Sequence, residues 1–205
     1  MPSRRPSPKQ GSILGVELPD PKWFVPVKEP VPVGALAGSL VEIPQAHAQL
    51  LLPSVARRVA DLPIDSPPRV VWSHDGSELL VHTDKVALAC TAGLITVAVV
   101  AQCDQVNGAV TLTVPFAVGT KAAPSGLVMH TFDRLAGPAI ITERWSPSVI
   151  AFAWELVVEL CSSLCAELGS DVRHRALIPG SIGAAPRLLL VQPIARHNVN
   201  LKAAR

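Results

Sequence analysis

Aromatic residues make up only 4% of the 205-residue chain, and tyrosine is absent. Apolar residues nonetheless account for 49% of the sequence, which is enough for a substantial core, so aliphatic side chains must fill most of it. A chain of this length fits one domain with appendages or two very small domains. We expect a single core.

Long apolar runs are also missing. The most apolar stretch, residues 86–101, is interrupted by Thr91, Gly93 and Thr96, and it falls short of the roughly 20 residues that span a bilayer. Residues 1–10 are basic, but no apolar segment follows them, so they do not have the form of a secretory signal. The sequence therefore predicts no membrane span, and the spacing of its cysteines predicts a reducing, cytoplasmic location.

Cysteines are few, and the spacing of Cys90, Cys103, Cys161 and Cys165 is not that of a disulfide scaffold. Cys161 and Cys165 lie one helical turn apart, a spacing at which two thiolates could bind one metal ion. No second pair follows to complete the four ligands that zinc normally takes. We therefore interpret both as buried apolar residues and predict neither a metal nor a cofactor.

Motifs of the common enzyme classes are absent as well. No serine stands in a Gly-x-Ser-x-Gly elbow, and the glycine patterns of phosphate-binding loops are missing. Two of the six histidines precede a carboxylate closely, His82 before Asp84 and His130 before Asp133. Because a carboxylate can orient an imidazole, His82, His130 and Asp133 are the candidate catalytic residues. An ordinary solvated histidine is the alternative at His82, and the sequence as a whole favours a chain that is not an enzyme.

Charge is unevenly distributed. Residues 1–10 carry three basic residues and no acidic one, residues 11–169 carry nine basic and fifteen acidic residues, and residues 170–205 carry six basic and one acidic. Basic ends on an acidic body fit arms that bind nucleic acid, or tails that are solvated or dock on their own body. We favour the second interpretation, because nucleic-acid-binding segments usually have denser charge or interleaved aromatic residues.

Proline density suggests how the chain is divided. Eight prolines lie in residues 1–38, which excludes a long helix and disfavours a central strand, so we interpret this segment as an extended arm. Within it Trp23, Phe24 and Val25 are too apolar for a solvated linker, and we expect them to contact the body or a partner. Residues 39–169 then form a single α+β domain, and residues 170–205 form a basic C-terminal arm with one short strand at 188–191.

Two turn dipeptides, Asp75-Gly76 and Asn107-Gly108, predict hairpins between runs of strand-forming residues. A type I′ turn needs positive φ at both central positions, which Asp or Asn followed by Gly tolerates. A less regular third pair of strands is expected at 127–132 and 139–143. Together these segments form a meander.

Two-residue loops fix the register of both hairpins. They place Trp72 opposite Leu79 in the first hairpin and Val99 opposite Phe116 in the second, all on one dry face. Pro115 would then fall at a hydrogen-bonded pair, where it has no donor, so the ladder should end or bulge there.

Helical patterns flank the meander. Residues 43–62 have helical spacing, but Pro53 should kink or divide this helix, with a second part starting near Ser54. The longest helix should begin at Ser146-Pro147 and end at Gly169. Its polar stripe is either a solvated edge or a surface for a cationic ligand or partner; it comprises Glu155, Glu159, Ser163 and Glu167.

The sequence thus predicts an α+β fold: a mostly antiparallel β-meander of five to seven strands, packed against one long helix in the C-terminal half, with a shorter broken helix before the sheet. This order of elements is similar to that of helix-grip folds. The resemblance implies a pocket for an apolar ligand between sheet and helix.

For function the sequence favours a non-catalytic binding or assembly protein that acts through protein–protein contacts, either with a protein partner or as a homo-oligomer. The patterns that can be detected in the sequence are those of packed strands and helices rather than of a catalytic site. Proline-rich and basic arms are suited to contact with neighbouring chains. Two alternatives remain open. One is a helix-grip-like protein that binds a small molecule, or a hydrolytic enzyme, with an enclosed pocket; the other is nucleic-acid binding through the basic termini.

Overall fold

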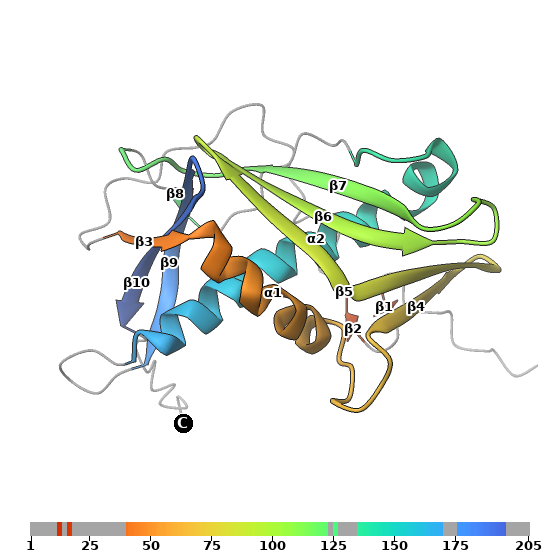
Figure 1. Cartoon of the computed structure of the whole chain (residues 1–205), viewed down its shortest axis with the longest axis horizontal. Helices are drawn as coiled ribbons and strands as arrows, with labels where there is room; N and C mark the ends of the chain where they lie inside the picture. The colour runs from red at the N-terminus through yellow and green to blue at the C-terminus, as the bar shows by residue number, and fades with distance from the viewer. Residues whose placement is uncertain are drawn as a thin grey trace, which may run out of the picture.

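The computed structural model describes residues 40–122, 135–169 and 176–195, together with the backbone of three short strands, β1 (Ser12–Ile13), β2 (Val16–Glu17) and β8 (Ser125–Gly126). Strands β1 and β2 pair with each other. The other described strands form two four-stranded antiparallel sheets, which are accompanied by two helices (Figure 1). The predicted α+β class, the antiparallel strands and the long helix are confirmed.

The first sheet is a four-stranded meander. Its strands β4 (Arg69–His74), β5 (Ser77–Thr91), β6 (Leu94–Gln102) and β7 (Val110–Ala117) are neighbours in sequence order, which leaves β4 and β7 at the two edges. In the first turn Asp75 and Gly76 have φ angles of 46° and 72°, as a type I′ turn requires. Trp72 lies opposite Leu79, so the predicted register of this hairpin is confirmed.

The predicted register of the second hairpin is wrong. Phe116 pairs with Ile95 rather than with Val99, because the strands are joined by residues 103–109 instead of a two-residue turn. Gly108 has a positive φ of 80°, but Asn107 does not, so the turn is not type I′. The partner of Phe116 moves by an even number of residues, and side chains alternate with a period of two. The predicted dry face is therefore retained, and Val99 and Phe116 are both fully buried.

Pro115 does not end or bulge the ladder, which was also a wrong prediction. It pairs with Thr96 in an uninterrupted register. Thr113 exchanges backbone hydrogen bonds with Ala136, outside the sheet, with N–O distances of 3.0 and 2.9 Å. Alternate residues of a strand direct their backbone groups to the same side, so Pro115 also faces the outer edge, where no ladder donor is needed.

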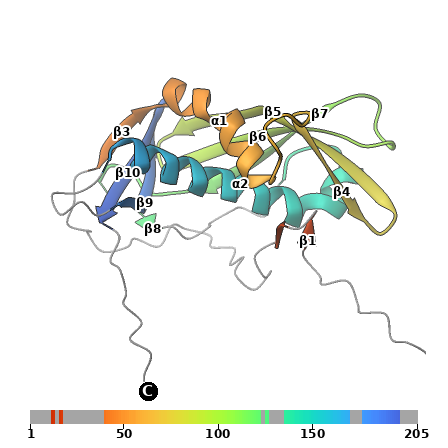
Figure 2. The ribbon, with the colours of Figure 1, turned by 90° about the horizontal axis from the view of Figure 1, so that it is seen from below.

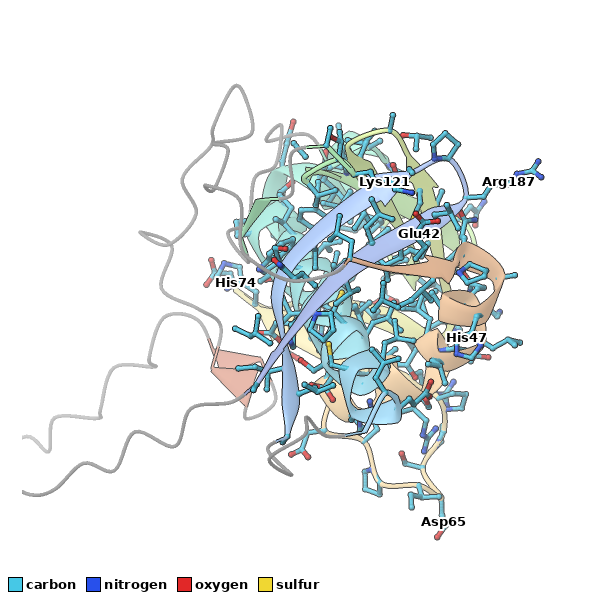
Figure 3. All side chains as sticks on the ribbon, turned by 90° about the vertical axis from the view of Figure 1, so that its left-hand side faces the viewer. Glu42, His47, Asp65, His74, Lys121 and Arg187 are labelled. Atoms are coloured by element: carbon cyan, nitrogen blue, oxygen red, sulfur yellow. The ribbon has the colours of Figure 1, made fainter. Side chains whose placement is uncertain are left out.

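The second sheet contains strands from both ends of the described chain, in the order β3 (Val41–Pro44), β10 (Leu188–Ala195), β9 (Leu177–Ala185) and β8. The strand predicted at 188–191 lies within β10, whereas β9 was not predicted. Lys121, which follows β7, forms an ion pair with Glu42 of β3, and Figure 3 shows the two side chains next to each other. The boundaries proposed between arms and domain stay predictions.

The two sheets are joined at one corner by backbone hydrogen bonds. Gly93, in the β5–β6 turn, donates to the carbonyl of Ala184 at 2.9 Å, and Ala184 donates to the carbonyl of Gly119 at 2.8 Å. Gly119 and Gly183 form a parallel bridge in which the backbones approach closely. A Cβ atom on Gly183 would lie only 2.8 Å from the Gly119 oxygen, so this position requires glycine.

Both helices are longer or more continuous than the sequence predicts. Helix α1 (Gln45–Val59) continues through Pro53, and α2 (Ala139–Glu167) begins after Pro138, with Pro147 inside it. The strand predicted at 139–143 is therefore wrong, as is the helix start at Ser146. The Ser146 hydroxyl instead donates to the Thr142 carbonyl one turn earlier in α2.

Helix α2 packs against the dry face of the meander and beside α1 (Figure 2). The rings of Trp72 and Phe152 meet edge to face at 5.4 Å, and those of Phe116 and Trp154 lie 5.3 Å apart. Among the described helices α2 alone is long and apolar enough to cross a membrane, with a mean hydropathy of 1.8, but 61% of that window is buried inside the fold. Such burial is typical of a helix at the centre of a core.

Candidate functional site

Several predicted site residues lie outside the part of the chain that the structure describes. Trp23, Phe24 and Val25, expected to contact the body or a partner, lie outside the described residues. The same holds for His130 and Asp133 and for the strand expected at 127–132. Of the candidate catalytic residues, the structure places His82 on β5.

His82 and Asp84 lie at an irregularity in β5, where the pairing with β6 shifts between His82 and Val86. The Nδ1 atom of His82 is 4.0 Å from Oδ1 of Asp84, which is too long for the hydrogen bond that would orient an imidazole as a base. Thr83 between them is fully buried, and its hydroxyl has no hydrogen-bond partner among the described residues. This segment therefore contains a conformational irregularity but no assembled acid–base pair.

Three of the four cysteines are buried: Cys90 of β5 and Cys161 and Cys165 of α2. Burial raises the pKa of Cys90 and Cys165 to about 11. The pKa of Cys161 is raised further, mainly by burial and also by the neighbouring thiols of Cys165 and Cys90. Thiolates are the form that binds metals and attacks electrophiles, so these thiols are poor candidates for either role. Within the described ranges no three His, Cys, Asp or Glu side chains are placed to hold a metal ion.

The polar stripe of α2 faces α1. Arg58 of α1 lies 3.2 Å from a carboxylate oxygen of Glu159, and it also donates to the Ser163 hydroxyl at 2.6 Å. Near the other end of α1, Nε2 of His47 (labelled in Figure 3) is 3.3 Å from Glu167. Basic residues of this chain thus pair with two of the three acidic residues in the stripe.

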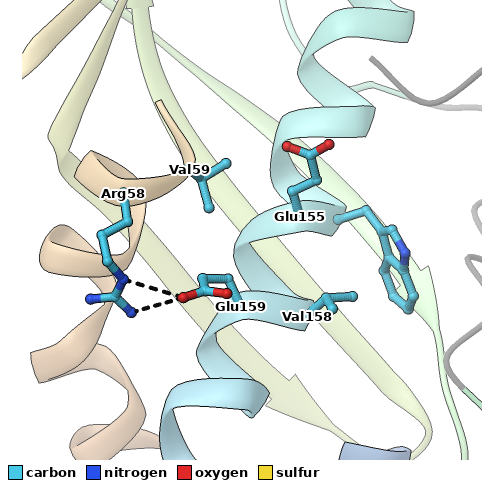
Figure 4. A pocket seen from close by; sticks show the side chains of 6 residues that line it. Arg58, Val59, Glu155, Val158 and Glu159 are labelled. Atoms are coloured by element: carbon cyan, nitrogen blue, oxygen red, sulfur yellow. Dashed lines mark hydrogen bonds and ion pairs between the residues drawn. The ribbon is translucent and has the colours of Figure 1, made fainter. Parts of the chain in front are cut away.

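Glu155 is the exception in this stripe. It lines an open groove of about 540 Å³ between the helices, together with Arg58 and Val59 of α1 and Trp154, Val158 and Glu159 of α2 (Figure 4). Partial burial raises the pKa of the Glu155 carboxyl, and no described residue forms an ion pair or hydrogen bond with it. The groove therefore combines an apolar wall with one carboxylate that a cationic group could contact.

The outer edge of β4 is a second surface with unused bonding capacity. In a two-residue hairpin loop the flanking residues, here His74 and Ser77, form a hydrogen-bonded pair. By alternation Trp72 and Val70 also bond to β5, whereas the N–H and C=O groups of Val71 and Ser73 face outward. No described residue bonds to these four groups.

The other edges differ from β4. The β7 edge carries Pro115 and is bonded to Ala136 at Thr113, and β3 is only four residues long and ends in Pro44. Such features normally protect an edge from pairing with another chain. Between Arg69 and His74 the β4 strand has neither proline nor lysine.

Comparisons with protein-family models, with curated proteins and with solved structures found no match to this chain. No pattern in the sequence indicated the β4 edge, because edge position depends on strand order. The sequence did indicate the polar stripe of α2, but not that basic residues of α1 would pair with two of its acidic residues.

Proposed function

We propose that this chain is a non-catalytic binding or assembly protein that acts through protein–protein contacts, and that a strand of its partner pairs with the outer edge of β4. The supporting observation is the row of outward N–H and C=O groups on Val71 and Ser73. Strand addition to such an edge is a common mode of recognition, in which main-chain hydrogen bonds supply affinity.

Backbone hydrogen bonds at the β4 edge can supply only part of the binding free energy. Four backbone hydrogen bonds at about 0.5–1.5 kcal/mol each would contribute roughly 2–6 kcal/mol. Association costs about 4–15 kcal/mol in lost freedom, so side-chain contacts must add to the strand pairing. The exposed side chains of Arg69, Ser73 and His74 lie on β4 itself and are available for this.

The groove beside Glu155 supports a second contact within the same function. Trp154 and Val158 offer apolar surface, and Glu155 offers a carboxylate without a partner among the described residues. A lysine or arginine of a partner protein would lay its aliphatic stem along the apolar wall and its charge against Glu155.

The alternative functions have less support. A helix-grip pocket needs space between sheet and helix, whereas the ring pairs Trp72–Phe152 and Phe116–Trp154 occupy that interface at two points. Nucleic-acid binding through the termini involves residues that the structure does not describe. A reducing, cytoplasmic setting is compatible with four free cysteines and stays a prediction.

Site-specific photo-crosslinking in cells tests the proposal. A photoreactive residue at Ser73 should give a discrete adduct, and the adduct should disappear when Val71→Pro is added, because proline removes an outward donor without removing a bond to β5. Ala89 is the matched control position and should give no such adduct, because it is exposed on β5, pairs with Thr96 of β6, and its neighbours Leu88 and Cys90 donate their amides to side chains of α1. Equal crosslinking at both positions, or an adduct that survives Val71→Pro, would count against strand addition at β4.

A further inference from the structure

The strand that pairs with β4 is, we infer, the β4 strand of a second copy of the chain. This assignment rests on the strand-pairing function proposed above. It adds the identity of the partner and the register of the contact, both of which follow from the backbone directions and charges of β4.

The outward groups of β4 are self-complementary. An antiparallel hydrogen-bonded pair exchanges both of its N–H···O bonds, so a partner must present outward residues opposite Val71 and Ser73. A second β4 related by a two-fold axis does this when Val71 of each copy faces Ser73 of the other. That register satisfies all four outward groups of each strand, and the two-fold axis passes between the Trp72 residues of the two copies.

The same register brings opposite charges together. With Val71 facing Ser73, Arg69 of each copy lies opposite the Asp75-Gly76 turn of the other, where the Asp75 carboxylate is within reach of a long arginine side chain. Arg69 has no ion pair with any described residue of its own chain, and the Asp75 side chain is 81% exposed. The only described partner of Asp75 is His74, at 3.4 Å. Two-fold symmetry makes this contact occur twice.

The assembled form is a continuous antiparallel sheet. Because the two-fold axis stands perpendicular to the sheet, both dry faces lie on the same side, and the two meanders join through β4 into eight strands. The unprotected edge of each chain is then buried in the partner. The edge strands β7 and β3 are protected from pairing by proline or by their short length. Pairing between two copies explains why β4 has no such protection.

Light scattering during size-exclusion chromatography tests the inference. The full chain should have twice the 21.6 kDa mass of one copy at micromolar concentration and should dissociate on dilution. Val71→Pro should be monomeric with an unchanged circular dichroism spectrum. Val71→Thr, which keeps the N–H group and β-branching, is the matched control and should remain dimeric.

A charge variant tests the register even if the proline variant folds poorly. In the Arg69→Glu variant a negative charge lies opposite Asp75 at two places in the dimer. The dissociation constant of the dimer should therefore rise roughly tenfold. Adding Asp75→Asn, which suits the turn, should recover much of that loss. A monomer at every concentration, or a dimer unaffected by Arg69→Glu, would overturn the inference. If crosslinks at Ser73 then identify a different protein, strand addition at β4 still stands.

Discussion

Replacing Gly183 with alanine should destabilise the joint between the two sheets. A Cβ atom there would lie 2.8 Å from the Gly119 oxygen, 3.1 Å from the Gly119 carbonyl carbon and 3.5 Å from the Cβ atom of Leu190. Two of these contacts are with backbone that cannot rotate away. The strands would have to separate by several tenths of an ångström, which stretches the 2.8 Å hydrogen bond from Ala184 to Gly119.

The expected cost follows from two opposing effects. Overpacking a close contact costs about 1–3 kcal/mol, and weakening one backbone hydrogen bond adds about 1 kcal/mol. Alanine also restricts the unfolded chain more than glycine does, which stabilises the folded state by about 0.4–1 kcal/mol. We therefore expect Gly183→Ala to lower the free energy of unfolding by about 1–4 kcal/mol.

Gly180→Ala is the matched control in the same strand. Its Cβ atom would meet the side chain of Ile194, with the nearest atom at 2.7 Å, but Ile194 is 38% exposed and can rotate outward. The change in stability should stay within about 1 kcal/mol of zero. Urea unfolding followed by tryptophan fluorescence measures both variants. Equal stabilities would refute the close approach of Gly119 and Gly183 as the joint between the sheets.

Three further predictions concern buried groups. Thr83→Val removes a buried hydroxyl that no described residue bonds to, so it should leave stability unchanged or raise it by about 1 kcal/mol in urea unfolding, whereas a loss would show that the hydroxyl is bonded. Burial raises the pKa of Glu155, so the native state disfavours the charged carboxylate. The resulting loss of folding stability is absent below the ordinary carboxyl pKa and grows as the pH rises through the raised pKa. Glu155→Gln should therefore be more stable than the native chain at pH 7 and equal to it at pH 4; a constant difference would contradict this. At pH 8 a thiol reagent should label half-buried Cys103 first, and the other three cysteines should react only on unfolding, so rapid labelling of all four would contradict their burial.

Local turn chemistry explains where sequence reasoning succeeded. Asp75-Gly76 encodes both a reversal and its register, because positive φ at both positions leaves one loop length. Asn107-Gly108 encodes a reversal alone, since only Gly108 has positive φ and residues 103–109 form the loop. Alternation of apolar residues still assigned the buried face correctly, which is why Val99 and Phe116 lie in the core although their partners differ.

Long-range pairing explains what the sequence missed. Strand β9 contains Pro179, Gly180 and Gly183, residues that normally indicate loops, and it becomes a strand by pairing with β10 and by closely approaching Gly119. Pro138 rather than Pro147 precedes the first turn of α2, and the helix continues through the exposed Pro147 with buried residues before and after it, Trp145 and Val149 among them. The candidate site was hidden for the same reason: whether β4 is an edge depends on which strands lie beside it.

Amide hydrogen exchange at Val71 and Ser73 tests most directly whether the outer edge of β4 is an interface. At a concentration where the chain is dimeric, these two amides should exchange more slowly than in dilute monomer, while the Trp72 amide, which bonds to β5, should exchange at the same slow rate in both. Fast exchange of the Val71 and Ser73 amides at every concentration would contradict pairing through this edge.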